Sequence, residues 1–137
     1  MRRVILASHG GLAQGTKASL EMILGERREM EAYGMYPGES AADFAAQLEK
    51  RVEAGPEDEF IIAADLYGAS VCNAMYPLTR YANVRLFAGF NLQFLVQLFC
   101  DYDSPLTDSD AETLLTDARE GLRRIDYSTP GNIEEDF

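Results

Sequence analysis

A single histidine stands at the point where a predicted first strand gives way to a glycine turn. The sequence there is Ser8-His9-Gly10-Gly11, directly after an apolar run. A neutral imidazole attacks phosphorus through one ring nitrogen while the other carries the proton, so His9 is a candidate nucleophile for phosphoryl transfer. We expect Gly10 and Gly11 to let their backbone amides approach an incoming phosphoryl oxygen. Since the chain has no other histidine, a reaction that needs two must take the second from a partner.

A carboxylate and a hydroxyl follow another apolar run of strand length. Asp65 comes directly after Phe60–Ala64, and Ser70 lies where the next helix should begin. In an open parallel sheet, ligands bind outside the carboxyl ends of the strands, where the strand order reverses. Asp65 would then face His9 across that crevice, accept the imidazole N–H and so fix the tautomer. Ser70 would cap its helix and offer a hydroxyl and the positive end of the helix dipole to a phosphoryl group.

These residues need a sheet to bring them together, and the rest of the chain predicts one. Apolar runs of strand length alternate with amphipathic segments of helix length. The predicted strands are Val4–Ser8, Glu29–Tyr36, Phe60–Ala64 and Val84–Phe90. The predicted helices are Leu12–Leu24, Ala41–Val52, Ser70–Tyr81, Leu92–Tyr102 and Asp108–Arg124, with a kink or early break expected at Pro77. The alternation indicates a single-domain α/β fold: an open, mainly parallel sheet in the order 2-1-3-4 with helices on both faces.

Composition excludes several classes of function. The 137 residues suit one domain, and the net charge of -11 disfavours nucleic acid as a partner because phosphate backbones attract basic surfaces. We expect neither a membrane-inserted segment nor a signal peptide, and so place the chain in the cytoplasm. The two cysteines, Cys72 and Cys100, lie far apart in sequence, which predicts buried reduced thiols rather than a disulfide or a zinc site. No cofactor and no metal are expected.

Four short segments, each at or just beyond the end of a predicted strand, carry a family resemblance. They are Ser8-His9-Gly10, Pro37-Gly38-Glu39, Asp65–Asn73 and Gly89–Leu95. In order and spacing they resemble T/S-H-G, P-G-E/D, D-x-x-G-G-S-P-x-N and G-x-N-L-P-M-L. These are motifs of the mannose-type (mannose/fructose/sorbose family) IIA component of the sugar phosphotransferase system (PTS). The resemblance makes residues 1–125 the IIA domain and leaves residues 126–137 as an acidic C-terminal tail.

The resemblance implies a phosphohistidine carrier, a type of phosphotransferase. His9 would accept a phosphoryl group from the phosphocarrier protein HPr and pass it to a IIB component that serves sugar uptake. The resemblance also makes Asp65 the partner of the imidazole and Ser70 a hydrogen-bond donor to the phosphoryl group, with the backbone at Gly68 and Ala69 close to that group. Family members are homodimers that exchange a C-terminal antiparallel strand. The candidate segment, Gly121–Tyr127, reads equally well as a helix end.

The sequence departs from the family pattern at three positions. Ala69 replaces the second glycine of the third motif, and Val71 and Gln93 replace prolines. A positive φ at Ala69 would strain the backbone there. Two other functions therefore stay open. One is a regulatory phosphohistidine module that signals the state of the PTS to a kinase or a transcription factor. The other is a non-catalytic dimeric binding module with a vestigial site.

Overall fold

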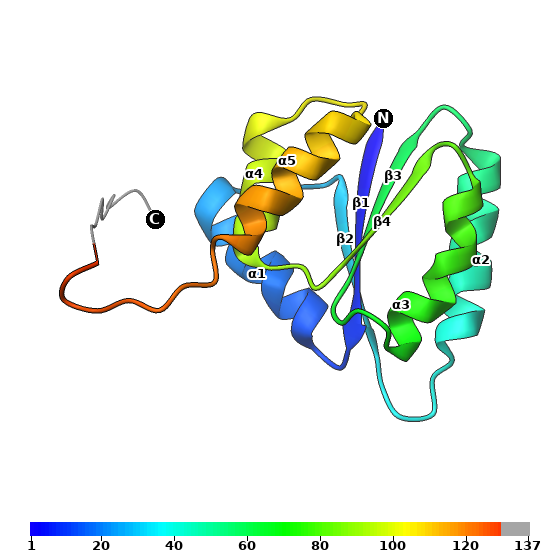
Figure 1. The fold of residues 1–137 in the computed structure, drawn as a ribbon. Helices are drawn as coiled ribbons and strands as arrows, with labels where there is room; N and C mark the ends of the chain where they lie inside the picture. Colours follow the sequence, from blue (N-terminus) through cyan, green and yellow to red (C-terminus); the bar gives the residue numbers. More distant parts are fainter. Residues whose placement is uncertain (130–137) are drawn as a thin grey trace.

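A four-stranded parallel sheet forms the centre of the computed structural model, which describes residues 1–129 (Figure 1). Its strands are β1 (Arg2–His9), β2 (Met30–Met35), β3 (Glu59–Ala64) and β4 (Val84–Ala88). They lie in the order β2-β1-β3-β4, and every neighbouring pair is parallel. The predicted α/β fold with strand order 2-1-3-4 is confirmed. Because β1 and β3 are adjacent, the residues that follow them meet at one edge of the sheet.

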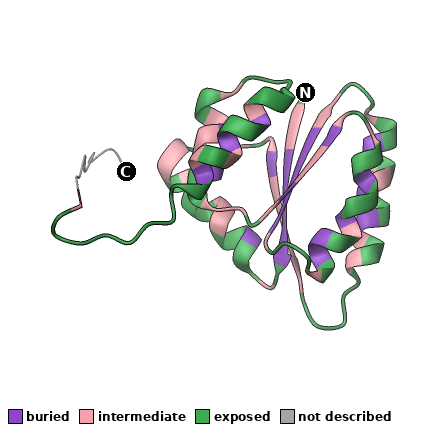
Figure 2. Cartoon of the chain, viewed as in Figure 1, coloured by how far each residue is buried: buried purple, intermediate pink, exposed green. Residues whose placement is uncertain are grey.

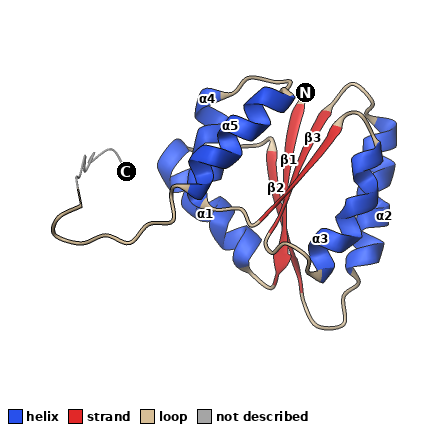
Figure 3. Ribbon diagram, viewed as in Figure 1, coloured by secondary structure: helices blue, strands red, loops and turns tan. Residues whose placement is uncertain are grey.

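Helices cover both faces of the sheet (Figures 1 and 3). One face carries α1 (Leu12–Leu24), α4 (Leu92–Asp101) and α5 (Asp108–Arg119). The other carries α2 (Ala41–Ala54), α3 (Ser70–Met75) and a 3-10 helix over Tyr76–Arg80.

The two central strands are the most deeply buried part of the chain (Figure 2). Val4–Ala7 and Ile61–Ala64 have no exposed surface. Since side chains alternate along a strand, Val4 packs towards α1, α4 and α5, whereas Ile5 packs towards α2. Burying one large aliphatic side chain stabilises the fold by about 1.5–3 kcal/mol. The ends of β1 and β3, from which the candidate site is built, are therefore firmly fixed.

The third helix breaks early, as predicted. Helix α3 ends at Met75 and the chain continues as the 3-10 helix, which has Pro77 in its first turn. A proline has no backbone N–H to donate to a helical carbonyl, and its ring crowds the preceding turn. The α-helix therefore stops just before the proline.

The last helix is shorter than predicted, and its expected end at Arg124 is wrong. The Nδ2 atom of Asn91 donates to the carbonyl of Ala118 at 3.0 Å, and the Nε2 atom of Gln93 donates to the carbonyl of Asp117 at 2.8 Å. In a longer helix those carbonyls would accept the amides of the next turn. The N-cap residue and the first turn of α4 thus supply donors to the last carbonyls of α5, and the helix ends there.

The segment after α5 forms neither of the two structures expected for it. Gly121–Tyr127 is neither a helix nor a strand in the single chain. Three of its apolar side chains are almost fully exposed: Leu122 at 90%, Ile125 at 79% and Tyr127 at 111% relative accessibility. A strand needs a neighbour for its backbone hydrogen bonds, and this segment pairs with no strand of the described chain. Of the predicted tail, residues 130–137 lie outside the described residues, and the domain boundary at residue 125 stays a prediction.

The two cysteines differ in exposure. Cys72 is buried, as predicted, but Cys100 is exposed and its predicted burial is wrong. Cys100 lies two residues beyond the buried Leu98 of α4, which puts it on the opposite side of that helix. None of the helices within residues 1–129 has the length and hydrophobicity that crossing a bilayer requires.

Candidate active site

His9 is the last residue of β1 and lies beside Asp65, the first residue after β3. The Nδ1 atom of His9 is 2.8 Å from Oδ2 of Asp65, and the backbone amide of His9 donates to the same oxygen at 2.8 Å. A carboxylate only accepts hydrogen bonds, so Nδ1 carries the proton when this bond is made. Nε2 is then the nitrogen with the free electron pair. The side chain of His9 is about half exposed (52%), whereas that of Asp65 is 9% exposed.

Strand β1 fixes the backbone of Asp65, and hydrogen bonds from His9 favour the charged form of its side chain. Its backbone amide donates to the carbonyl of Ala7 in β1 at 3.1 Å. Burial raises the pKa of the Asp65 carboxyl, but the hydrogen bonds from the His9 amide and ring outweigh burial, so the pKa lies below its ordinary value. Asp65 is therefore ionised at neutral pH. It can stabilise positive charge that develops on the imidazole.

Ser70 approaches the other ring nitrogen of His9. Its Oγ lies 3.3 Å from Nε2, on the first residue of α3. The prediction that Ser70 caps this helix is wrong: Ala69 is the N-cap, and no side chain caps the first turn. The reason is that Ala69 takes the extended conformation of a cap residue, with φ at -88°. The Ser70 hydroxyl is therefore not needed as a cap. The negative φ also leaves Ala69 unstrained.

A residue of α3, Asn73, restrains the loop before Ser70 through two hydrogen bonds. Gly68 has φ at +78°, and its carbonyl accepts a hydrogen bond from Nδ2 of Asn73 at 3.0 Å. The amide of Asn73 donates to the carbonyl of Ala69 at 2.9 Å. Asn73 therefore holds the loop that carries Ser70, a role that the sequence pattern did not predict.

A buried serine holds the turn that follows His9. Ser8 has no exposed surface; its Oγ accepts the amide of Ala13 at 2.8 Å and donates to the carbonyl of Gly10 at 3.2 Å. Gly10 needs a positive φ of 55° to make this turn, and Gly11 is the N-cap of α1. Ser8 belongs to the Ser8-His9-Gly10 motif, but the motif does not predict this structural role.

A shallow pocket of about 480 Å³ opens beside His9. Gly10 and Ser70 line it with His9 on one side, and the segment from Met35 to Glu39 lines it on the other. Gly11, Gly68 and Ala69 are not among its lining residues. The Pro37-Gly38-Glu39 motif was the sequence signal for this wall, but Tyr36 was not singled out. No group of three or more His, Cys, Asp or Glu side chains in residues 1–129 is placed to hold a metal ion.

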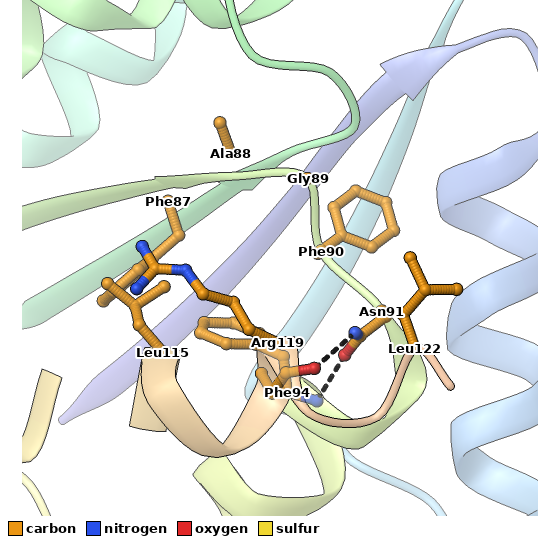
Figure 4. Close-up of a pocket in the computed structure, with 10 residues that line it drawn as sticks. Phe87, Ala88, Gly89, Phe90, Asn91, Phe94, Leu115, Arg119 and Leu122 are labelled. Carbon is orange, nitrogen blue, oxygen red and sulfur yellow. Dashed lines mark hydrogen bonds between the residues drawn. The ribbon is translucent and has the colours of Figure 1, made fainter. Parts of the chain in front are cut away.

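Another pocket, of about 280 Å³, lies at the end of β4, between α4 and α5 (Figure 4). Phe87, Phe90, Phe94, Leu115 and Leu122 line it, with Arg119 at its margin. It holds no nucleophile and no carboxylate. The pocket beside His9, in contrast, has an imidazole and the Ser70 hydroxyl among its lining residues.

Comparison with known proteins identifies the family of this chain. The model of the family EIIA-man, described as "PTS system fructose IIA component", matches residues 3–115. The chain belongs to this family. It is 32% identical over its whole length to the sorbose-specific EIIA component of the PTS from Klebsiella pneumoniae, the whole of which is also covered.

Solved structures of the family share the fold. A putative phosphoenolpyruvate-dependent sugar PTS permease from Klebsiella pneumoniae superposes with a TM-score of 0.78 at 28% identity, covering 90% of each chain. The mannose/sorbose-specific IIA subunit from Enterococcus faecalis gives 0.78 at 27% identity, covering 91% of this chain and 95% of that one. The chain is thus a mannose-family IIA component of a sugar phosphotransferase system.

Proposed function

We propose that this IIA component is a phosphohistidine carrier, which accepts a phosphoryl group from HPr on Nε2 of His9 and passes it to a IIB component. The observation that carries the proposal is the 2.8 Å contact between Nδ1 of His9 and the Asp65 carboxylate. It directs the electron pair of Nε2 towards the pocket. The pocket leaves room for a phosphoryl group carried by another protein.

The transfer needs one bond to form and one to break. The electron pair of Nε2 forms the new N–P bond, while the P–N bond of the donor breaks and its electrons return to the donor's ring. Positive charge develops on the His9 ring. The Asp65 carboxylate, which accepts a hydrogen bond from Nδ1–H, stabilises that charge. The second transfer, to the IIB component, repeats the step with His9 as the leaving group. Phosphoryl transfer of this kind depends mainly on positioning and on stabilising charge.

Ser70 and the turn after His9 supply the polar groups around the phosphoryl oxygens. The Ser70 hydroxyl, 3.3 Å from Nε2, is placed to donate to a phosphoryl oxygen once Nε2 is phosphorylated. Gly10 lines the same pocket, and its backbone leaves space at the entry of α1. We propose Gly11, Gly68 and Ala69 only as supports of the two loops, since they do not line the pocket.

Two substitutions, Ala69 and Val71, suggested a vestigial site, and neither strains the segment that leads into α3. Ala69 has a negative φ, and Val71 is fully buried within α3. The loop still presents Ser70 to His9. These observations favour a competent carrier over a vestigial site.

We further propose that two copies form a homodimer in the cytoplasm by exchanging the segment Gly121–Tyr127. The outer edge of β4 has no neighbouring strand in the described chain. In such a strand the exposed side chains of Ile125 and Tyr127 would share one apolar face, because residues two apart point the same way. The apolar pocket at the end of β4 lies beside the start of this segment (Figure 4).

The decisive experiment passes phosphate from phosphoenolpyruvate through enzyme I and HPr and reads the chain by intact mass. We expect the wild type to gain one acid-labile phosphoryl group and then to lose it to a IIB component. The His9→Gln variant should gain none. Circular dichroism of that variant controls for folding. An unmodified wild type beside fully phosphorylated HPr, or a labelled His9→Gln variant, would contradict the proposal.

A further inference from the structure

Tyr36 is the first residue after β2 and one of the residues that line the pocket beside His9. Its side chain is half exposed, at 48%, and it lines the pocket together with His9, Gly10 and Ser70. Its phenolic oxygen lies 3.5 Å from the position that a Cβ atom on Gly11 would occupy, at the entry of α1. We propose that Tyr36 donates a hydrogen bond from this hydroxyl to the phosphoryl group on His9. This inference rests on the proposed function.

A tight turn fixes the backbone of Tyr36. The turn contains Pro37 and then Gly38, whose φ is +89°, the sequence and conformation of a type II turn. The amide of Glu39 donates to the carbonyl of Tyr36 at 3.0 Å, and the amide of Tyr36 donates to Oε1 of Glu39 at 3.1 Å. These reciprocal bonds restrain Tyr36 on both sides of its peptide.

The end of β2 also lies unusually close to the turn after His9. The amide of Gly10 donates to the carbonyl of Met35 at 2.8 Å. A Cβ atom on Gly34 would lie 2.1 Å from the carbonyl oxygen of Gly10 and 2.9 Å from the side chain of Gln14. Only a glycine at position 34 allows this approach. The sequence therefore brings the strand that carries Tyr36 against the residues that surround the nucleophile.

The residues that line the pocket offer little positive charge to a bound phosphoryl group. Its lining residues include no lysine or arginine, and the one carboxylate among them is that of Glu39. A phosphoryl group on His9 brings negative charge that no side-chain cation in the lining offsets. Neutral donors, hydroxyls among them, can offset this charge, because a hydrogen bond to a charged acceptor is stronger than one between neutral groups. Ser70 supplies one from the β3 side, and Tyr36 supplies the other from the β2 side.

The test uses the phosphoprotein itself, loaded at its only histidine with phosphoramidate, so it does not depend on the identity of the donor protein. The pKa of the phosphoryl group is then followed by ³¹P NMR in the wild type and in Tyr36→Phe. A donated hydrogen bond favours the dianion, so its loss should raise that pKa by about half a unit to one unit. Tyr76→Phe, an exposed tyrosine outside the pocket, is the matched control and should leave the titration unchanged.

Transfer from phosphorylated HPr gives the second readout. We expect Tyr36→Phe to lower the rate of phosphorylation about tenfold at saturating HPr, the size of one hydrogen bond to a charged acceptor. An unchanged ³¹P titration would overturn the inference; if KM for HPr alone then rises, Tyr36 serves docking instead. A wild type that phosphoramidate loads but HPr does not would contradict the proposed function while leaving the titration valid. A His9 that phosphoramidate cannot load would overturn both.

Discussion

One carboxylate oxygen, Oδ2 of Asp65, accepts both the backbone amide and the ring Nδ1 of His9, each at 2.8 Å. The second oxygen, Oδ1, is buried and has no hydrogen-bond partner within the described residues. The negative charge of Asp65 is therefore directed at His9, from which it fixes both the backbone and the ring. A single side chain thus sets the tautomer, the ring orientation and the electrostatics of the nucleophile.

Asp65→Asn should slow phosphorylation of His9 on the order of a hundredfold, because the amide places no negative charge beside the developing imidazolium. Rapid-quench measurement of transfer from phosphorylated HPr gives the rate, and ¹⁵N NMR of the imidazole reads the tautomer. Asp101→Asn, an exposed change at the end of α4, is the control. A rate equal to that of the wild type would show that Asp65 serves only the fold.

Ser8→Ala should loosen the turn that follows His9. The substitution leaves the amide of Ala13 without its acceptor and removes the bond to Gly10, which should lower the free energy of unfolding by about 1–2 kcal/mol. Urea denaturation measures that free energy, and hydrogen exchange of the Ala13 amide reads the local effect. Ser19→Ala, exposed in α1, is the control: it should leave exchange at Ala13 unchanged and should not lower the free energy of unfolding, because alanine is the better helix former. Unaltered exchange at Ala13 would mean that water replaces the hydroxyl.

The meeting of His9 and Asp65 could be predicted because it depends on two simple rules. Apolar runs identify β1 and β3 as buried parallel strands, and strand order places their carboxyl ends side by side. No detail of side-chain packing enters that argument. The same rules predicted the sheet order and the two-sided helical cover.

The features that the sequence did not predict depend on contacts between distant segments. The last carbonyls of α5 accept hydrogen bonds from Asn91 and Gln93 at the start of α4, and the local helical pattern after Ala118 carries no sign of these contacts. The Ser8 hydroxyl acts through a turn whose geometry is known only once β2 lies against it. Tyr36 reached the site through the close approach that Gly34 permits. Each depends on three-dimensional packing rather than on local pattern.

Gly34→Ala should damage the site and the fold together. Its methyl group would collide with the carbonyl of Gly10, and overpacking of this kind costs about 1–3 kcal/mol. The end of β2 must then move away from His9, so phosphorylation should slow as well. Gly15→Ala is the matched control, because a Cβ atom at this exposed helical position meets nothing within 4 Å and should stabilise the chain by about 0.5–1 kcal/mol. Thermal unfolding and the transfer rate are measured on both variants, and a neutral Gly34→Ala would disprove the close approach.

Glu59→Gln should weaken the fold without affecting phosphotransfer, because Glu59 begins β3 at the end of the sheet opposite Asp65. Its carboxylate contacts Nε of Arg2 at 2.7 Å, the Ser104 hydroxyl at 2.8 Å and the Leu106 amide at 2.5 Å. Breaking this largely buried ion pair should cost about 2–3 kcal/mol of unfolding free energy near neutral pH. Glu57→Gln, exposed two residues earlier, is the control.

The cost of Glu59→Gln should depend on pH in a defined direction. Burial raises the pKa of Glu59, but hydrogen bonds from Arg2, the Leu106 amide and Ser104 outweigh burial and place the pKa below its ordinary value of 4.5. The unfolded chain therefore takes up the proton at higher pH than the folded chain, so the stabilisation by Glu59 is complete above pH 4.5 and declines as the pH falls through the lowered folded pKa. Urea denaturation of wild type and variant across this range should give two curves that converge on the acid side. A difference that stays constant as the pH falls would assign the effect of Glu59 to packing rather than to its charge.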